Sequence, residues 1–253
     1  ATQSVVVLYS SVDEAFLRRI VDDYARRDGV RVQIVGDSEA GKTTGLVNRI
    51  RLEQDRPRAD VFWSSEQSQT ILLAREGLLA AYDSPAAADI PKAYRDPRNL
   101  WTGFALRARV VAYDPERIDA NALPTTWEGY ADGDWPGRLA LANPLFGTTR
   151  GHMAAMRASW GAGRFRTYLE KLVAGGVTLA DGNATAVRKL IAGEVAVAFT
   201  DSDDVITARA KGARVAMVFP DMGDGGTLVI PNTVALVAGG PNPAAGRALI
   251  DYI

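Results

Sequence analysis

The sequence contains no cysteine and only one histidine, His152. The absence of cysteine excludes disulfides, thiolate metal sites and thiol nucleophiles. A single histidine excludes a histidine-rich metal site, and any Ser-His-Asp triad would depend on His152 alone. No apolar run approaches the roughly 20 residues that a membrane-spanning helix needs. The sequence therefore offers few of the side chains that the common hydrolytic mechanisms use.

Neither positive nor negative charge is in excess. The 29 basic and 30 acidic residues give a formal net charge of −1. This balance gives no electrostatic reason to expect binding to nucleic acid or to an anionic membrane. The 253 residues, 47% of them hydrophobic and 23% charged, are typical of a globular protein with one large or two ordinary domains.

Short apolar runs alternate with helical patterns, which predicts an α/β fold with parallel sheets and right-handed crossovers. A first unit has expected strands at 5–9, 30–35 and 60–63, and a second has expected strands at 139–142, 177–179 and 195–199. The long strands near Val110 and Thr233 are the expected connections. We therefore expect two lobes, the first built from 1–109 with 231–253 and the second, inserted lobe from 110–230.

The strand predicted around Val195–Phe199 ends in an acidic, hydroxyl-rich turn, Thr200-Asp201-Ser202-Asp203-Asp204. Ligands of open α/β sheets gather at the carboxyl ends of strands. Asp201 and Asp203 are therefore candidate ligand contacts, and Asp201→Ala is expected to weaken binding with little loss of stability. The alternative is that Asp201 caps the next helix and its neighbours are solvated.

Polar residues follow other predicted strands and helix starts as well. Ser10, Ser11, Ser65 and Glu66 come at strand ends of the first lobe, where hydroxyls and helix amides make a polar pocket floor. The alternative for these residues is ordinary helix capping. In the second lobe, the run Thr148-Thr149-Arg150 combines hydroxyls, free amides and a guanidinium, a set that suits an oxyanion or carboxylate.

Residues Gly36 to Thr43 match the phosphate-loop pattern G-x-x-x-x-G-K-[ST] between a strand and a helix. In that interpretation Lys42 reaches phosphates and Thr43 holds magnesium. Asp37 and Glu39 oppose it, because carboxylates inside the loop repel a polyphosphate. The alternative is a helix start that Ser38 or Asp37 caps.

The chain as a whole resembles the ferric-type (family 1) extracellular solute-binding proteins of ABC importers, which have the periplasmic-binding-protein type II fold. The resemblance covers nearly the whole sequence. It is carried by Leu8–Ser11, Ala59–Glu66, Glu76–Leu79, Arg109–Asp114 and Gly193–Ala198.

The resemblance implies two lobes joined by two crossover hinge strands, with a small ligand captured between them by hinge closure. It also implies a periplasmic or extracellular protein whose signal peptide has been removed, and an ABC permease as membrane partner. In iron-binding members a glutamate follows the strand matching Trp63, and Glu66 occupies that position. Those members also have a tyrosine pair where this chain has Thr200 to Asp204. The family usually continues beyond the helix that ends near Ile253, so a shortened chain is expected.

The sequence thus predicts a monomeric binding protein, with ligand contacts at Ser10, Ser11, Ser65, Glu66, Thr148, Thr149, Arg150, Asp201 and Asp203. Glu66 and Asp201 are the candidate metal ligands, for iron with a synergistic anion. Hard oxygen donors also suit another metal complex or a small polar or charged organic solute. Two alternatives stay open, namely a nucleotide-binding protein using Gly36–Thr43 and an enzyme on the same fold using His152 or Glu66.

Overall fold

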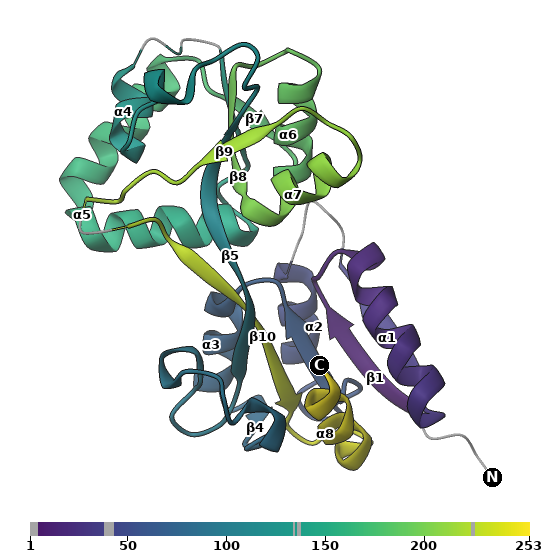
Figure 1. Ribbon diagram of the computed structural model, residues 1–253. Helices are drawn as coiled ribbons and strands as arrows, with labels where there is room; N and C mark the ends of the chain where they lie inside the picture. Colours follow the sequence, from purple (N-terminus) through teal and green to yellow (C-terminus); the bar gives the residue numbers. More distant parts are fainter. Residues whose placement is uncertain (1–4, 38–42, 134, 136–137, 224–225) are drawn as a thin grey trace. The chain divides into compact units, whose positions relative to one another are not determined.

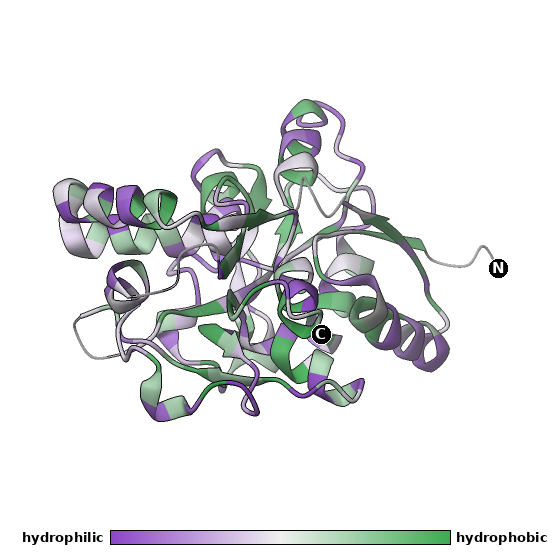
Figure 2. Cartoon of the chain, turned by 90° about the horizontal axis from the view of Figure 1, so that it is seen from above, coloured by the Kyte–Doolittle hydropathy of each residue, from purple (hydrophilic) through white to green (hydrophobic). Residues whose placement is uncertain are grey.

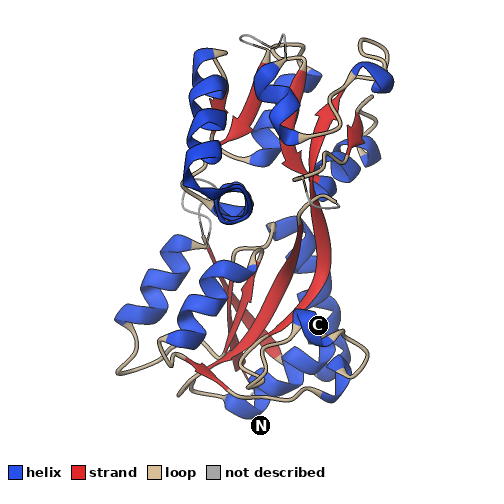
Figure 3. Ribbon diagram, turned by 90° about the vertical axis from the view of Figure 1, so that its left-hand side faces the viewer, coloured by secondary structure: helices blue, strands red, loops and turns tan. Residues whose placement is uncertain are grey.

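The computed structural model describes residues 5–37, 43–133, 135, 138–223 and 226–253. The chain divides into two compact units, unit 1 from 1–106 with 231–253 and unit 2 from 107–230 (Figure 1). The chain passes between the units within two strands, β5 (Thr102–Tyr113) and β10 (Val229–Val237). Both units are α/β, which confirms the predicted fold class (Figure 3).

Unit 1 is built on a mixed sheet with strand order β2-β1-β3-β10, in which β4 also pairs with β10. β1, β2 and β3 are parallel and β10 is antiparallel to β3. The remaining elements are β1 (Val5–Ser10), α1 (Glu14–Asp28), β2 (Arg31–Gly36), α2 (Thr44–Leu52), β3 (Val61–Ser64), α3 (Gln67–Arg75), β4 (Leu79–Ala80), the 3₁₀ turns Pro85–Ala87 and Lys92–Tyr94, and α8 (Pro243–Tyr252).

Side chains that alternate along β1 and β3 pack on opposite faces of the unit 1 sheet. Leu8 and Trp63 belong to a core that includes buried residues of α1 and α8, whereas Tyr9 and Phe62 belong to a core with α2 and α3. A strand buried on both faces reads as a continuous apolar run, as Val5–Tyr9 does. Hydrophobic colour accordingly concentrates along the strands, while the helices carry both colours (Figure 2).

Unit 2 has strand order β5-β8-β6-β7, and β9 also pairs with β5. β6, β7 and β8 are parallel, and β5 is antiparallel to β8. Its other elements are the 3₁₀ turn Ala120–Ala122, α4 (Trp127–Asp132), β6 (Leu139–Ala142), α5 (Gly147–Ala174), β7 (Thr178–Ala180), α6 (Asn183–Ile191), β8 (Val197–Asp201), α7 (Ser202–Ala210) and β9 (Ala216–Val218).

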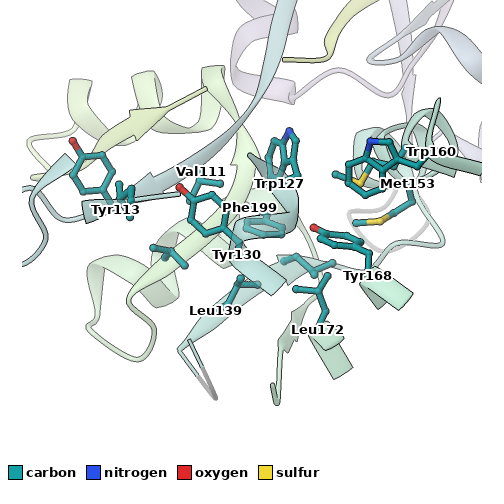
Figure 4. Packing of buried hydrophobic residues seen from close by; sticks show 14 residues of the cluster. Val111, Tyr113, Trp127, Tyr130, Leu139, Met153, Trp160, Tyr168, Leu172 and Phe199 are labelled. Atoms are coloured by element: carbon teal, nitrogen blue, oxygen red, sulfur yellow. The ribbon is translucent and has the colours of Figure 1, made fainter. Parts of the chain in front are cut away.

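An aromatic core joins the unit 2 sheet to α4 and α5. Phe199 of β8 packs edge-on against Trp127 and Tyr130 of α4, with ring centroids 5.0 and 5.6 Å apart (Figure 4). The opposite face is lined by smaller residues such as Ala198, which pack against α6 and α7. Helices therefore cover both faces of the sheet and leave its strand ends to carry polar residues.

Two helices of unit 2 begin with polar residues. α5 starts at Gly147 and is kinked at Gly161, whose φ of 80° suits glycine. α7 starts at Ser202. Both starts place polar candidate residues in first helical turns. None of the helices in the described part of the chain is long and apolar enough to cross a membrane.

Candidate functional site

The carboxyl ends of the three parallel strands of unit 2 bring together polar residues from three parts of the sequence. Asp201 is the last residue of β8, Thr148 follows β6 in the first turn of α5, and Asn183 follows β7 at the start of α6. Since parallel neighbours end at one edge of a sheet, these side chains meet there.

Asp201 is the centre of this group and is 1% exposed. Its Oδ1 accepts a hydrogen bond from Arg109 Nη1 at 2.6 Å, and its Oδ2 accepts from Thr148 Oγ1 at 2.6 Å and Asn183 Nδ2 at 2.9 Å. Arg109 is itself fully buried and lies directly opposite Asp201 in the β5–β8 register. The four residues form a buried, charge-paired network, here called the Asp201 network.

The Asp201 network uses most of the hydrogen-bonding capacity of the residues predicted to bind ligand. Thr148 Oγ1 also accepts from Asn183 Nδ2 at 2.9 Å, and Thr149 Oγ1 donates to Asn183 Oδ1 at 3.3 Å. Asp201 directly precedes α7, but its side chain does not cap that helix. The capping alternative therefore does not describe this carboxylate, which instead neutralises a buried arginine.

His152 lies beneath the same network and is fully buried. Its Nδ1 accepts from Arg109 Nε at 3.3 Å, and its ring packs edge-on against Trp127 with centroids 4.3 Å apart. Burial, with a smaller contribution from the Arg109 charge, holds the pKa of His152 well below its usual value of 6.5. A neutral histidine enclosed in this way packs inside unit 2.

Three charged residues flank the Asp201 network with more exposure. The Arg107 side chain is 14% exposed and pairs with Asp203 at 3.2 Å and with Asp201 at 3.7 Å. The Asp203 side chain is 46% exposed. Arg150 is half-buried in the first turn of α5. These residues have the access to solvent that Thr148, Thr149 and Asp201 lack.

Unit 1 has a second polar group, in which the hydroxyls of Thr43, Ser11 and Ser65 are linked. Thr43 Oγ1 donates to Ser11 Oγ at 2.9 Å, and the Oγ atoms of Ser11 and Ser65 lie 3.3 Å apart. The Ser65 amide also donates to Ser11 Oγ at 3.0 Å. These residues follow β1 and β3 or precede α2, so they too lie at the carboxyl ends of parallel strands.

The other predicted residues of unit 1 make local contacts. Ser10 Oγ accepts from the Val12 amide at 3.2 Å. The Glu66 carboxylate, 2% exposed, accepts from the backbone amides of Ser68 at 2.6 Å and Gln69 at 3.2 Å, and also from the Ser68 hydroxyl. Glu66 is thus the N-cap of α3. Its predicted role as a metal ligand stays a prediction.

The phosphate-loop pattern falls largely outside the described residues, since Ser38 to Lys42 are not among them. At its edge, the Asp37 carboxylate accepts from the Leu46 amide at 3.2 Å, within the first turn of α2. A carboxylate therefore occupies part of the helix start that a phosphate would need.

A hard metal ion would meet both carboxylates and guanidinium groups in unit 2. Oxygen atoms of Asp201, Asp203 and Asp204 lie within 4.8 Å of one another. Asp201, however, already pairs with Arg109 at 2.6 Å, and Arg107 pairs with Asp203. Positive groups this close oppose a bare cation, whereas a metal bound together with an anion meets less repulsion. The donors therefore fit a metal complex better than a free ion.

Arg109, Asn183 and Thr43 also belong to these polar groups, although they were not predicted as ligand contacts from the sequence. Arg109 carried a usable signal, because it directly precedes the apolar run Val110-Val111-Ala112 of a predicted buried strand. A charge that enters a buried strand needs a partner of opposite sign. The identity of that partner depends on the β5–β8 register, which joins residues 92 positions apart.

The fold is that of two-lobed solute-binding proteins. Iron-bound HitA from Pseudomonas aeruginosa superimposes with a TM-score of 0.89 at 25% identity, covering 98% of this chain and 80% of that one. The family model described as "Bacterial extracellular solute-binding protein" matches residues 9–253. The chain therefore belongs to the bacterial extracellular solute-binding protein family.

The names of individual relatives specify different ligands. The chain is 27% identical over 192 residues to the Fe(3+)-binding periplasmic protein of Serratia marcescens, covering 75% of this chain and 54% of that protein. It is 26% identical over 266 residues to a putative 2-aminoethylphosphonate-binding periplasmic protein of Salmonella paratyphi A, covering 99% of this chain and 74% of that protein. The chain thus spans little more than half the length of the Serratia relative.

Proposed function

We propose that this chain is the solute-binding component of an ABC importer and captures a small polar or charged solute. One observation carries the proposal: each unit gathers polar side chains at the carboxyl ends of its own parallel strands, which is where α/β sheets bind ligands. In unit 2 these are the Asp201 network and the charged residues beside it. In unit 1 they are the linked hydroxyls.

The proposed ligand contacts come from both units. Ser10, Ser11, Ser65 and Glu66 would act from unit 1, and Thr148, Thr149, Arg150, Asp201 and Asp203 from unit 2. Because contacts from two bodies favour one mutual arrangement only when a ligand bridges them, ligand binding would stabilise a closed state through β5 and β10. A membrane permease would then recognise that state.

The ligand is proposed to be a metal complex, such as iron with an anion, or a small organic solute with an anionic group. The iron-binding and phosphonate-binding names of relatives support this range. Arg107, which is partly exposed beside the acidic cluster, supports a ligand that includes an anion. We further propose a monomer that acts in the periplasm or at the cell surface, does not bind nucleic acid and does not catalyse a reaction.

Native mass spectrometry with elemental analysis of the purified protein tests this function. A small solute or metal that remains on the native protein and leaves on denaturation is the expected result. The solute identified in this way should then raise the melting temperature of the dialysed protein. A protein whose melting temperature is raised by nucleoside triphosphates, but by no metal complex or small anion, contradicts the proposal.

A further inference from the structure

We propose that the linked hydroxyls of unit 1 recognise an oxyanion of the ligand, with the Ser65 hydroxyl as the group that donates to it. This inference rests on the proposed solute-binding function and assigns the ligand a chemical class. Its basis is the direction in which hydrogen bonds run through Thr43, Ser11 and Ser65.

Ser11 Oγ fixes this direction. It accepts two hydrogen bonds, from Thr43 Oγ1 at 2.9 Å and from the Ser65 amide at 3.0 Å. A hydroxyl oxygen has two acceptor lone pairs and one hydrogen. With both lone pairs occupied, Ser11 Oγ can be only the donor in its 3.3 Å contact with Ser65 Oγ.

Ser65 is therefore the last of the linked hydroxyls. Its oxygen accepts from Ser11, and its own hydrogen has no acceptor among the residues that the structure describes. The residue as a whole is only 7% exposed. A buried donor without an acceptor is costly, and its partner is expected to be supplied by something that binds.

The arrangement selects for an acceptor. Successive hydroxyls that donate in one direction polarise one another, so the last hydrogen is a stronger donor than that of an isolated serine. Hydrogen bonds to ionised acceptors are also about twice as strong as those between neutral groups. An ionised oxygen of a phosphoryl, phosphonate or carboxylate group is the acceptor that benefits most from this geometry.

Thr43, the first of the linked hydroxyls, has a strained backbone conformation. Thr43 is fully buried and has a φ of +73°, a region that β-branched residues rarely adopt. Conformations of this kind cost on the order of 1–3 kcal/mol and persist where the surroundings enforce them. In this position the Thr43 hydroxyl reaches Ser11. The neighbouring Glu66 carboxylate accepts hydrogen bonds from the first turn of α3, and among the described residues it makes none with the Ser65 hydroxyl.

The test is isothermal titration of the full dialysed chain with separate probes. Inorganic phosphate, 2-aminoethylphosphonate and citrate carry ionised oxygens, whereas Mn²⁺ and tetramethylammonium carry none. We expect at least one oxyanion to bind saturably. Ser65→Ala should then raise its Kd by about 10- to 100-fold, the effect of losing one hydrogen bond to a charged group. Ser65→Thr, which keeps the hydroxyl, should restore most of the affinity.

Two further variants separate an effect of the linked hydroxyls from a general loss of structure. Thr43→Val keeps the branched shape but removes the first donor, so it should raise Kd by a smaller factor and add nothing in the Ser65→Ala background. Ser84→Ala is the matched control, since its buried hydroxyl donates to Asp251 at 2.6 Å, away from the hydroxyl chain. This control should leave Kd unchanged.

The outcomes distinguish this inference from the proposed function. Binding of an oxyanion with Kd unchanged in Ser65→Ala overturns the inference but leaves solute binding intact. Binding of only Mn²⁺ or tetramethylammonium does the same. If none of the probes binds and no solute accompanies the purified protein, both the inference and the proposed function fail.

Discussion

Replacing Asp201 with alanine removes the only acidic partner of a fully buried arginine within hydrogen-bonding distance in the described structure. Arg109 is 0% exposed, and its Nη1 lies 2.6 Å from Asp201 Oδ1. Breaking a buried ion pair by deleting one member costs about 3–5 kcal/mol, because the remaining charge is left uncompensated. Thr148 and Asn183 would lose an acceptor as well. The sequence predicted little loss of stability in Asp201→Ala, whereas the buried ion pair predicts a large loss.

This loss is measurable by urea unfolding followed by tryptophan fluorescence and far-UV circular dichroism. With about 2–4 °C per kcal/mol for a protein of this size, Asp201→Ala should also lower the melting temperature by roughly 6–20 °C. Asp203→Ala is the matched control, because this acid is 46% exposed and pairs with Arg107 at 3.2 Å. Exposed pairs of this kind contribute less than about 1 kcal/mol.

A double variant identifies the cause. Arg109→Met in the Asp201→Ala background removes the second charge, so it should recover much of the lost stability. An Asp201→Ala protein within 1 kcal/mol of the wild type would refute the reasoning. So would a double variant whose loss of stability relative to the wild type equals the sum of the losses in the two single variants.

Three other predictions concern titration and packing. The pKa of His152 is lowered in the folded protein, so the unfolded state takes up the proton first as the pH falls. At pH values below 6.5, the free energy of unfolding should therefore decrease by up to about 1.4 kcal/mol per pH unit. His152→Gln should flatten this dependence in urea titrations. Burial and Glu53 raise the pKa of Tyr9 to about 12, so melting temperatures should fall as pH rises above 10, less so in Tyr9→Phe. Trp127→Ala should cost about 3–5 kcal/mol in urea unfolding, whereas Phe219→Ala, at an exposed position, should cost less than about 0.5 kcal/mol.

Much of the fold could be predicted from local patterns. The final helix was expected to end near Ile253, and α8 begins at Pro243 and ends at Tyr252, because proline favours a first helical turn and the apolar spacing continues to the end. The apolar run Val5–Tyr9 predicts a doubly covered strand. The start of α5 was less accessible, since Gly147 and two threonines are poor helix formers that the following helix incorporates.

The candidate site was predictable only in part, for a different physical reason. Strand ends can be read from the sequence, which placed Asp201, Thr148 and Ser65 among polar residues at the correct edges. Burial and partners cannot be read in the same way, since they follow from strand register and from contacts between distant segments. The Arg109–Asp201 pair and the Ser11–Ser65 contact both depend on such pairings.

The central claim is that one small solute is bound by residues of both units. It is tested most directly by titrating the solute identified by native mass spectrometry into the wild type and two single variants, Ser65→Ala in unit 1 and Arg150→Ala in unit 2. The account predicts that each variant weakens binding of the same solute by 10-fold or more while the protein stays folded. Affinity that is unchanged in either variant would contradict it.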